Sequence, residues 1–252
     1  MRRGAVAGIL FAGPLVAAWA GPVDHGDSIE VAAEHQSLSK GFADWRETSL
    51  RVARAYGPRE LLSMNVRRTD RFGLDDTSAG LAYTVPLDPR FVASMEASFS
   101  PSHRVLPRHE LGAAIQYEFA PAWLLHGGFK TTAYDNTTVR QGLVRLERYV
   151  SSFSWSVAWR PTQALGTYAQ GVELRGSYYY GDKNVVGLIL AAGREATAIG
   201  EQRVVLADVR TVALTGRHWF DPAWALTYSL ERIRQGTFYS RSGIRLGVQY
   251  SF

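Results

Sequence analysis

The segment "GIRLGVQYSF" at residues 243–252 alternates strictly between apolar side chains and polar or small ones. One parity of this segment carries Ile244, Leu246, Val248, Tyr250 and Phe252. A period of two is typical of a β-strand with one apolar face. Chain ends are usually polar and frayed, so an alternation that continues to Phe252 indicates that this residue has a structural place. The rest of the sequence must identify the surface that accepts it.

The same alternation recurs along the chain. It is clearest in "FVASMEASF" (91–99), "LGAAIQYEF" (111–119), "FSWSVAW" (153–159) and "WALTYSL" (224–230). A tilted strand of about 9–11 residues is long enough to cross a bilayer. No convincing amphipathic helix separates these segments, so the sequence predicts an all-β protein.

The connections between these segments alternate in length. Short turns rich in Pro, Gly, Asp and Asn lie at 56–59, 86–89, 120–122, 150–152, 181–184 and 221–223. Longer polar connections lie at 39–44, 69–77, 101–108, 134–138, 161–166, 195–203 and 234–240. This interleaving predicts a transmembrane up-and-down antiparallel β-barrel of about 14 strands, the first of them at 28–39. A barrel of 12 strands is the alternative, if two of these segments do not pair.

Aromatic residues gather beside the short turns and the C-terminus, and this distribution favours lipid over water. The set comprises Tyr56, Tyr83, Phe91, Phe119, Trp123, Tyr149, Phe153, Tyr180, Trp219, Phe220, Trp224 and Tyr250. In a barrel they form one ring, as expected of an interfacial aromatic girdle. A second, sparser ring is expected at Phe99, Phe129 and Trp159. A soluble sandwich gives no reason to concentrate aromatics at alternate turns.

The N-terminus resembles a secretory signal peptide. It has basic residues Arg2 and Arg3, an apolar stretch and the small-residue pattern Ala18-Trp19-Ala20. We expect cleavage after residue 20, which makes 1–20 the signal peptide and 21–252 the outer-membrane barrel. An uncleaved anchor helix is the alternative, although the apolar stretch is short for a membrane span.

Composition excludes several classes of partner and chemistry. The chain of 252 residues has no cysteine, which excludes disulfides and zinc–thiolate sites. Its net charge of +5 comes from basic residues scattered among acidic ones, so we expect no nucleic-acid partner. The six histidines lack the spacing of metal ligands, and no cofactor motif is present. Sequence analysis therefore predicts no metal, no cofactor and no catalytic residue.

If the apolar parity faces lipid, the charged parity lines the barrel. The predicted pore-lining residues are Arg51, Arg67, Glu96, Glu118, Lys130, Arg145, Glu147, Arg175 and Arg245. The arginines of this set are expected to contact anionic sugars, while its glutamates and Glu173 oppose or pair with them. A barrel of this size encloses more space than side chains alone fill. Both a narrow water-filled pore and a charge network that closes the lumen remain open.

Several short motifs carry a resemblance to a known family. They include "DWRE" (44–47), "RFGLDD" (71–76), "SPSHRVLPR" (100–108), "LERY" (146–149), "SYYYGDKN" (177–184), "AAGRE" (191–195), "VALTGRHW" (212–219) and the terminal segment. In this order they resemble the YaiO family of outer-membrane β-barrels. The resemblance implies the outer membrane of a Gram-negative cell and an association with surface-polysaccharide genes. It offers no catalytic residues.

These observations predict a passive outer-membrane channel or porin for small polar solutes or a saccharide, linked to surface-polysaccharide export. Expected partners are outer-membrane lipid and lipopolysaccharide, saccharide or polysaccharide-export proteins, and the outer-membrane assembly machinery. Resemblance to outer-membrane proteins implies that this machinery reads the terminal Phe252. Two alternatives remain: an outer-leaflet hydrolase that uses His103 or His109, with Ser102 and Glu110 as its partners, and a structural barrel with a sealed lumen.

Overall fold

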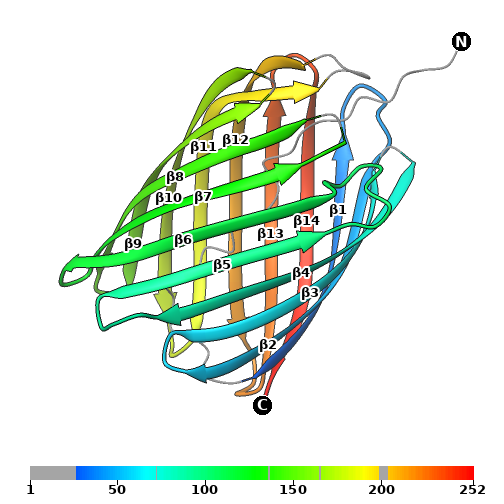
Figure 1. The fold of residues 1–252 in the computed structure, drawn as a ribbon. Coiled ribbons are helices and arrows are strands. Elements are labelled where there is room, and N and C mark those ends of the chain that lie inside the picture. The colour runs from blue at the N-terminus through cyan, green and yellow to red at the C-terminus, as the bar shows by residue number, and fades with distance from the viewer. Residues whose placement is uncertain (1–26, 72, 136, 165, 199–203) are drawn as a thin grey trace, which may run out of the picture.

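The computed structural model describes residues 27–252 except 72, 136, 165 and 199–203, with side chains described outside 195–206. The chain forms a closed barrel of antiparallel strands (Figure 1). The strands are β1 (Ser28–Leu38), β2 (Trp45–Gly57), β3 (Glu60–Arg71), β4 (Leu74–Pro86), β5 (Phe91–Phe99), β6 (His109–Ala120), β7 (Trp123–Ala133), β8 (Thr138–Val150), β9 (Phe153–Ala164), β10 (Thr167–Tyr180), β11 (Asn184–Ala198), β12 (Val204–Trp219), β13 (Trp224–Gln235) and β14 (Tyr239–Ser251).

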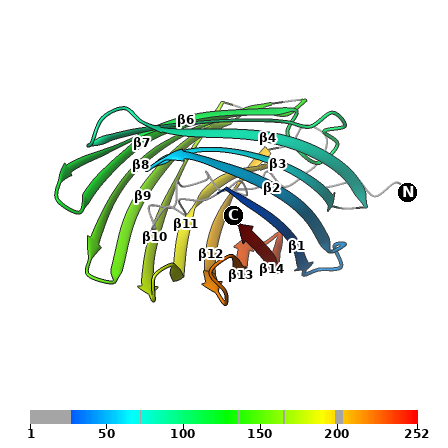
Figure 2. The same ribbon diagram turned by 90° about the horizontal axis from the view of Figure 1, so that it is seen from below.

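Each strand pairs with its neighbours in sequence, and β1 closes the wall by pairing with β14 (Figure 2). The closing register joins Ser28 to Ser251 and Leu38 to Arg241. The predicted all-β antiparallel barrel of 14 strands is therefore confirmed, and β1 coincides with the predicted first strand. Among the described residues, no helix has the length and apolar character needed to cross a membrane.

Burial alternates along the strands and places the apolar side chains on the outside. Val31 is 60% exposed and Phe129 62% exposed, whereas Gln249 and Glu173 are buried on the inward-facing parity. This arrangement inverts that of a water-soluble domain, in which the large apolar side chains are the buried ones. It suits a barrel whose outer surface contacts lipid.

The barrel has two different ends, a short-turn end and a loop end. The short-turn end carries the connections 58–59, 87–90, 121–122, 151–152, 181–183 and 220–223. The loop end carries the connections at the opposite ends of the strands. Strands extend into several segments predicted as loops, so that β3 and β4 are separated only by residues 72–73 and β9 and β10 only by 165–166. The predicted connection 39–44 is confirmed, and the predictions 101–108 and 134–138 agree within one residue with the observed connections 100–108 and 134–137. The predictions 69–77, 161–166, 195–203 and 234–240 were too long, because the flanking strands extend into them. Polar residues can continue a strand above the membrane, and a hydrophobic pattern cannot detect that extension.

Aromatic side chains form contacts around the short-turn end. Phe91 stacks on Tyr117 with ring centroids 4.5 Å apart, and Tyr250 lies 4.7 Å from Trp224 and 5.8 Å from Phe252. Most of the predicted girdle faces outward.

Two predicted girdle residues face inward instead. Tyr149 shares its parity with Arg145 and stacks on Tyr179, and Trp219 shares its parity with Arg217, which lies over its ring. Their assignment to the lipid face was wrong because it rested on distance from a turn, whereas the strand parity decides the direction of a side chain.

Candidate functional site

The inward face of the barrel carries the residues predicted to line a pore. All nine predicted residues occupy the inward-facing parity of their strands. The structure sorts most of them into separate charged groups, and each group contains partners from neighbouring strands.

The most basic of these groups lies on β8, β9 and β10. Arg145, Arg160 and Arg175, here called the arginine triad, surround the single carboxylate of Glu173. The guanidinium nitrogens lie 3.7, 2.8 and 3.6 Å from the Glu173 oxygens. Cross-strand register explains this meeting, because Ala158 on β9 pairs with both Arg145 and Glu173. Three positive charges on one negative charge leave this patch of the wall positive.

The triad retains hydrogen-bonding capacity. Arg145 is only 5% exposed. Its Nε and Nη2 atoms, and Nε of Arg160 and Arg175, have no hydrogen-bond partner among the described residues. Arginine presents five donors in a planar fork that matches carboxylate and phosphate groups. These unpartnered nitrogens are themselves buried, but the side chain of Arg175 is 27% exposed, so other atoms of this guanidinium group can be reached from the interior.

A second positive group lies across the closing seam of the barrel. Arg245 on β14 contacts Glu30 on β1 at 2.8 Å, and Thr227 donates a hydrogen bond to the same oxygen. Arg51 faces Glu30 across the β1–β2 pair, and Arg217 lies close enough to interact electrostatically with Arg51. The seam therefore has more guanidinium groups than carboxylates near Glu30, and like the arginine triad it carries a net positive charge.

The remaining predicted residues form balanced or isolated contacts. Lys130 lies 3.3 Å from both Glu96 and Glu110, and Glu147 lies 3.0 Å from Nε2 of His126.

Two predicted residues belong to none of these groups. Glu118 accepts a hydrogen bond from the backbone N–H of Ala122 at the short-turn end. Arg67 donates a long bond of 3.4 Å to Ser78. Neither residue contacts another predicted site residue through a described contact.

Sequence analysis missed a packed cluster on the inner wall near the loop end. Trp45 is 2% exposed, and the guanidinium carbons of Arg71 and Arg241 lie 4.9 and 5.1 Å from its ring centre. Tyr239 contacts Trp45 edge to face. Cation–π contacts of this kind join residues of different strands. The available signal was the odd parity that Trp45 shares with Glu47 and Arg51 on the same strand.

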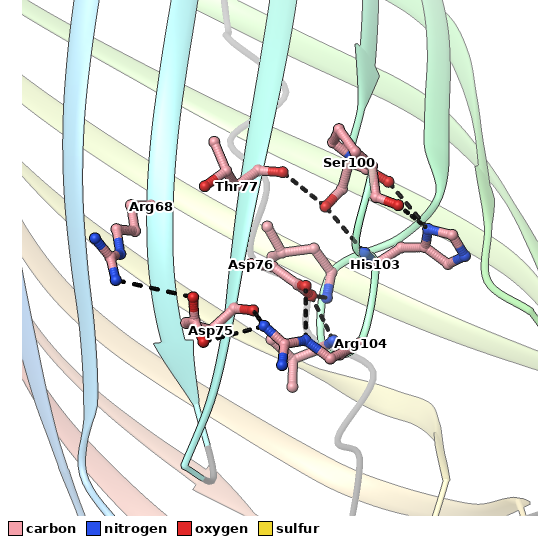
Figure 3. A network of polar contacts seen from close by, with 10 residues as sticks. Arg68, Asp75, Asp76, Thr77, Ser100, His103 and Arg104 are labelled. Atoms are coloured by element: carbon pink, nitrogen blue, oxygen red, sulfur yellow. Dashed lines mark hydrogen bonds and ion pairs between the residues drawn. The ribbon is translucent and has the colours of Figure 1, made fainter.

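Loop 100–108 fills a notch in the wall above the short strand β5. Strand β4 pairs with β5 only from Ala79 onward, so the start of β4 projects beyond it. The Ser100 hydroxyl donates to the Thr77 carbonyl at 2.8 Å (Figure 3). The Asp76 carboxylate accepts bonds from the N–H groups of Val105 and Leu106 at 2.6 and 2.9 Å. These bonds satisfy an edge of β4 that would otherwise lack partners.

The outer side of this loop is tied down by charged pairs. Arg104 lies 3.0 Å from Oδ1 of Asp75 and 3.7 Å from Asp76, and Arg68 lies 3.8 Å from Asp75 (Figure 3). The loop is therefore fixed to β4 from both the inward and the outward side.

The candidate hydrolase residues do not form a triad in the structure. Nδ1 of His103 faces the backbone oxygens of Ser100 and Pro101, and its Nε2 lies 3.1 Å from Asp135. Glu110 points instead to Lys130. Nucleophile, base and orienting acid must be in mutual hydrogen-bond contact to act together, and these groups are not. Among the residues described, no cluster of three His, Asp or Glu side chains could hold a metal ion.

Replacing Asp76 by alanine is expected to release loop 100–108. The change removes the acceptor of two backbone N–H groups, each worth about 1 kcal/mol or more. Trypsin cleavage after Arg104 in the folded, membrane-inserted protein should become about thirty-fold faster, as measured by mass spectrometry of the fragments. Asp88→Ala is the matched control, because this carboxylate also accepts two backbone N–H groups, those of Arg90 and Phe91, but in a turn at the opposite end of the barrel. It should leave the rate of cleavage after Arg104 unchanged. Unchanged cleavage of the Asp76→Ala protein would show that other contacts hold the loop.

Comparisons with known proteins agree with this architecture. The family described as "YaiO membrane beta barrel domain" matches residues 26–198. No curated protein matches the chain.

Solved outer-membrane barrels share the fold at low identity. A bacterial polysaccharide outer membrane secretin superposes with a TM-score of 0.63 at 9% identity, over 91% of this chain and 99% of its own. The CymD monoaromatic hydrocarbon channel superposes with a TM-score of 0.60 at 10% identity, over 90% of this chain and 89% of its own. Omp33 of Acinetobacter baumannii superposes with a TM-score of 0.55 at 9% identity, over 90% of this chain and 99% of its own. The family and these neighbours together indicate an outer-membrane β-barrel that resembles porins and channels.

Proposed function

This chain belongs to the YaiO family of membrane β-barrels, and we propose that it forms a passive channel for small polar solutes, with anionic saccharides the preferred class. The observation that carries the proposal is the inward face of the closed 14-strand wall, where charged side chains replace the apolar residues of an ordinary core. A lumen built this way suits water and hydrated solutes rather than lipid.

The distribution of charge supports an anionic solute. The arginine triad places three guanidinium groups on the Glu173 carboxylate, and at the seam Arg245 contacts Glu30 while Arg51 lies opposite it. The Arg245 side chain is 31% exposed, so it can be reached from the lumen. Rings of Arg and Lys favour anions in pores. Solute hydroxyls would bind the neutral polar residues between these groups.

The proposal includes a link to polysaccharide export. One neighbour in fold is described as a polysaccharide outer membrane secretin, and another as a channel for monoaromatic hydrocarbons. Because similarity at this identity concerns the fold alone, the choice between these two classes of solute rests on the charged inner wall. That wall argues against a hydrocarbon and favours a polar, anionic sugar.

The proposal also covers enzymatic activity and the export of this chain to the outer membrane. We assign no enzymatic activity to this chain: of the two candidate bases, His103 and His109, His103 contacts backbone carbonyls and Asp135 instead of Ser102. Export through a cleaved signal peptide at 1–20 concerns residues outside the described part of the chain. Recognition of Phe252 by the assembly machinery of the outer membrane belongs to the same proposal.

Single-channel recording tests the proposal. The protein, refolded and inserted into a planar bilayer, should give discrete conductance steps and a reversal potential that favours anions. In the variant Arg145→Gln, Arg175→Gln, the anion preference should fall about two- to five-fold, since a water-screened contact with one charge is worth up to about 1 kcal/mol. Glu173 keeps Arg160 as a partner in this variant, so the barrel should remain folded.

The matched control removes two arginine charges from the outer surface of the barrel instead of from the lumen. In the variant Arg54→Gln, Arg148→Gln, both positions face outward near the short-turn end, and the ion preference should stay unchanged. A fully folded barrel that gives no current would overturn the channel and favour a structural barrel with a sealed lumen. Conductance without loss of anion preference in the lumen variant would overturn the role of the triad.

A further inference from the structure

Arginines recur on the outward-facing parity near the loop end of the barrel. On several strands, the row of apolar outward-facing residues above the girdle is followed by an arginine. The positions are Arg46, Arg68, Arg140, Arg194, Arg210, Arg232 and Arg234. All of these side chains are exposed.

The densest group is on β12 and β13. Arg210, Arg232 and Arg234, here called the outer arginine cluster, occupy neighbouring outward positions, and Arg210 lies directly opposite Arg234 in the register. Like charges that face each other across a strand pair are destabilising. Among the described residues, no carboxylate forms an ion pair with the cluster. The nearby Asp208 instead lies 3.4 Å from Arg194.

The height of the cluster places it at the membrane surface. Arg232 follows the girdle residue Trp224 by eight residues on β13, with Leu226 and Leu230 exposed between them. Eight residues of a strand tilted by about 40° rise about 20 Å, and the apolar band of such barrels is about 25 Å tall. The guanidinium groups therefore reach the upper edge of the band, where the long side chains can extend toward headgroups.

The loop end of outer-membrane barrels faces the cell exterior, since the short turns lie on the periplasmic side. The lipid that meets the cluster is consequently that of the outer leaflet. Planar guanidinium groups bind phosphate through paired hydrogen bonds. Exposed Val212 and Leu214 beside the cluster supply an apolar surface for acyl chains below the headgroup.

We propose that the outer arginine cluster binds the phosphates of lipid A, the glycolipid of outer-leaflet lipopolysaccharide. A phosphate between Arg210 and Arg234 offsets the repulsion between two like charges that the fold places opposite each other. The binding site is independent of the lumen, so its test does not depend on whether the barrel conducts.

Binding of purified lipid A to the folded protein in detergent, followed by native mass spectrometry, tests this site. The wild-type protein should retain diphosphoryl lipid A and lose most of this binding when both phosphates of the lipid are removed. The variant Arg210→Gln, Arg234→Gln should bind diphosphoryl lipid A about thirty-fold more weakly, since each of the two basic residues near an anionic lipid surface contributes about five-fold to binding. The control variant Arg54→Gln, Arg148→Gln, outward but at the opposite end, should bind within about two-fold of wild type.

Additional controls test whether a variant is still folded and whether the bound ligand is a lipid or a soluble anion. Heat-modifiable migration reports the folded barrel, and Arg210→Lys, Arg234→Lys should restore much of the binding by keeping the charge. Inorganic pyrophosphate in millimolar excess should leave lipid binding largely intact. Complete displacement by pyrophosphate would overturn the lipid assignment in favour of a soluble anion. Equal weakening in both glutamine variants would overturn the site itself.

Discussion

Replacing Glu173 by glutamine is expected to lower the free energy of unfolding of the barrel by about 3–5 kcal/mol, the usual result of removing one partner from a buried ion pair. Among the described residues, Glu173 is the only carboxylate within 4 Å of Arg145, Arg160 and Arg175, although Glu147 also interacts electrostatically with Arg145. Its loss leaves three guanidinium groups facing one another. Urea unfolding in lipid vesicles, monitored by tryptophan fluorescence, measures the change.

A matched substitution separates this effect from the loss of any inward carboxylate. Glu118→Gln removes a charge that accepts one backbone bond near a turn, and it should cost about 1 kcal/mol or less. In the Glu173→Gln protein that still folds, anion preference should rise, because the wall has lost negative charge. A destabilisation below about 1 kcal/mol would mean that water in the lumen screens the arginine triad effectively.

Gly193→Val is expected to destabilise the barrel by about 2–3 kcal/mol through overpacking. Gly193 on β11 faces Gly171 on β10 in the register. A Cβ atom at Gly193 would lie 2.5 Å from the backbone oxygen of Gln170 and 2.6 Å from Cα of Gly171. Backbone atoms cannot rotate away as a side chain can, so the two strands must separate. The same unfolding measurement reports the loss.

Gly127 provides the comparison. A Cβ atom at this glycine meets nothing within 4 Å, so Gly127→Ala should change the free energy of unfolding by about 0.5 kcal/mol or less. If both glycine variants were equally stable, strand separation near Gly193 would have to be easier than the close approach of the backbones implies.

Strand parity was the part of the structure that the sequence could predict. Alternation in "GIRLGVQYSF" separates Arg245 from Leu246 without knowledge of any neighbour, and the same test placed Arg51 and Lys130 on the inward face. Strand number also followed from the sequence, because an up-and-down barrel has one turn between each pair of successive segments. These are local properties with a period of two residues.

Cross-strand partners could not be predicted in this way. Glu173 meets Arg145 because the strands on either side of β9 align at Ala158, and alignment depends on the register of every turn between them. For the same reason, the approach of Arg210 to Arg234 and the anchoring of loop 100–108 by Asp76 were invisible in the sequence. The candidate triad around His103 failed because short spacing along a loop does not fix where side chains point.

The pairing of β1 with β14 has a consequence for how the barrel is made. Every other strand pair joins neighbours in sequence, and can form as soon as both strands are available. The seam joins segments more than two hundred residues apart, so it carries the largest loop-closure entropy of any pair. Until it forms, β1 and β14 are exposed sheet edges that can pair with other chains. Closure is thus the step at which a holding chaperone or an assembly template would have the largest effect on yield.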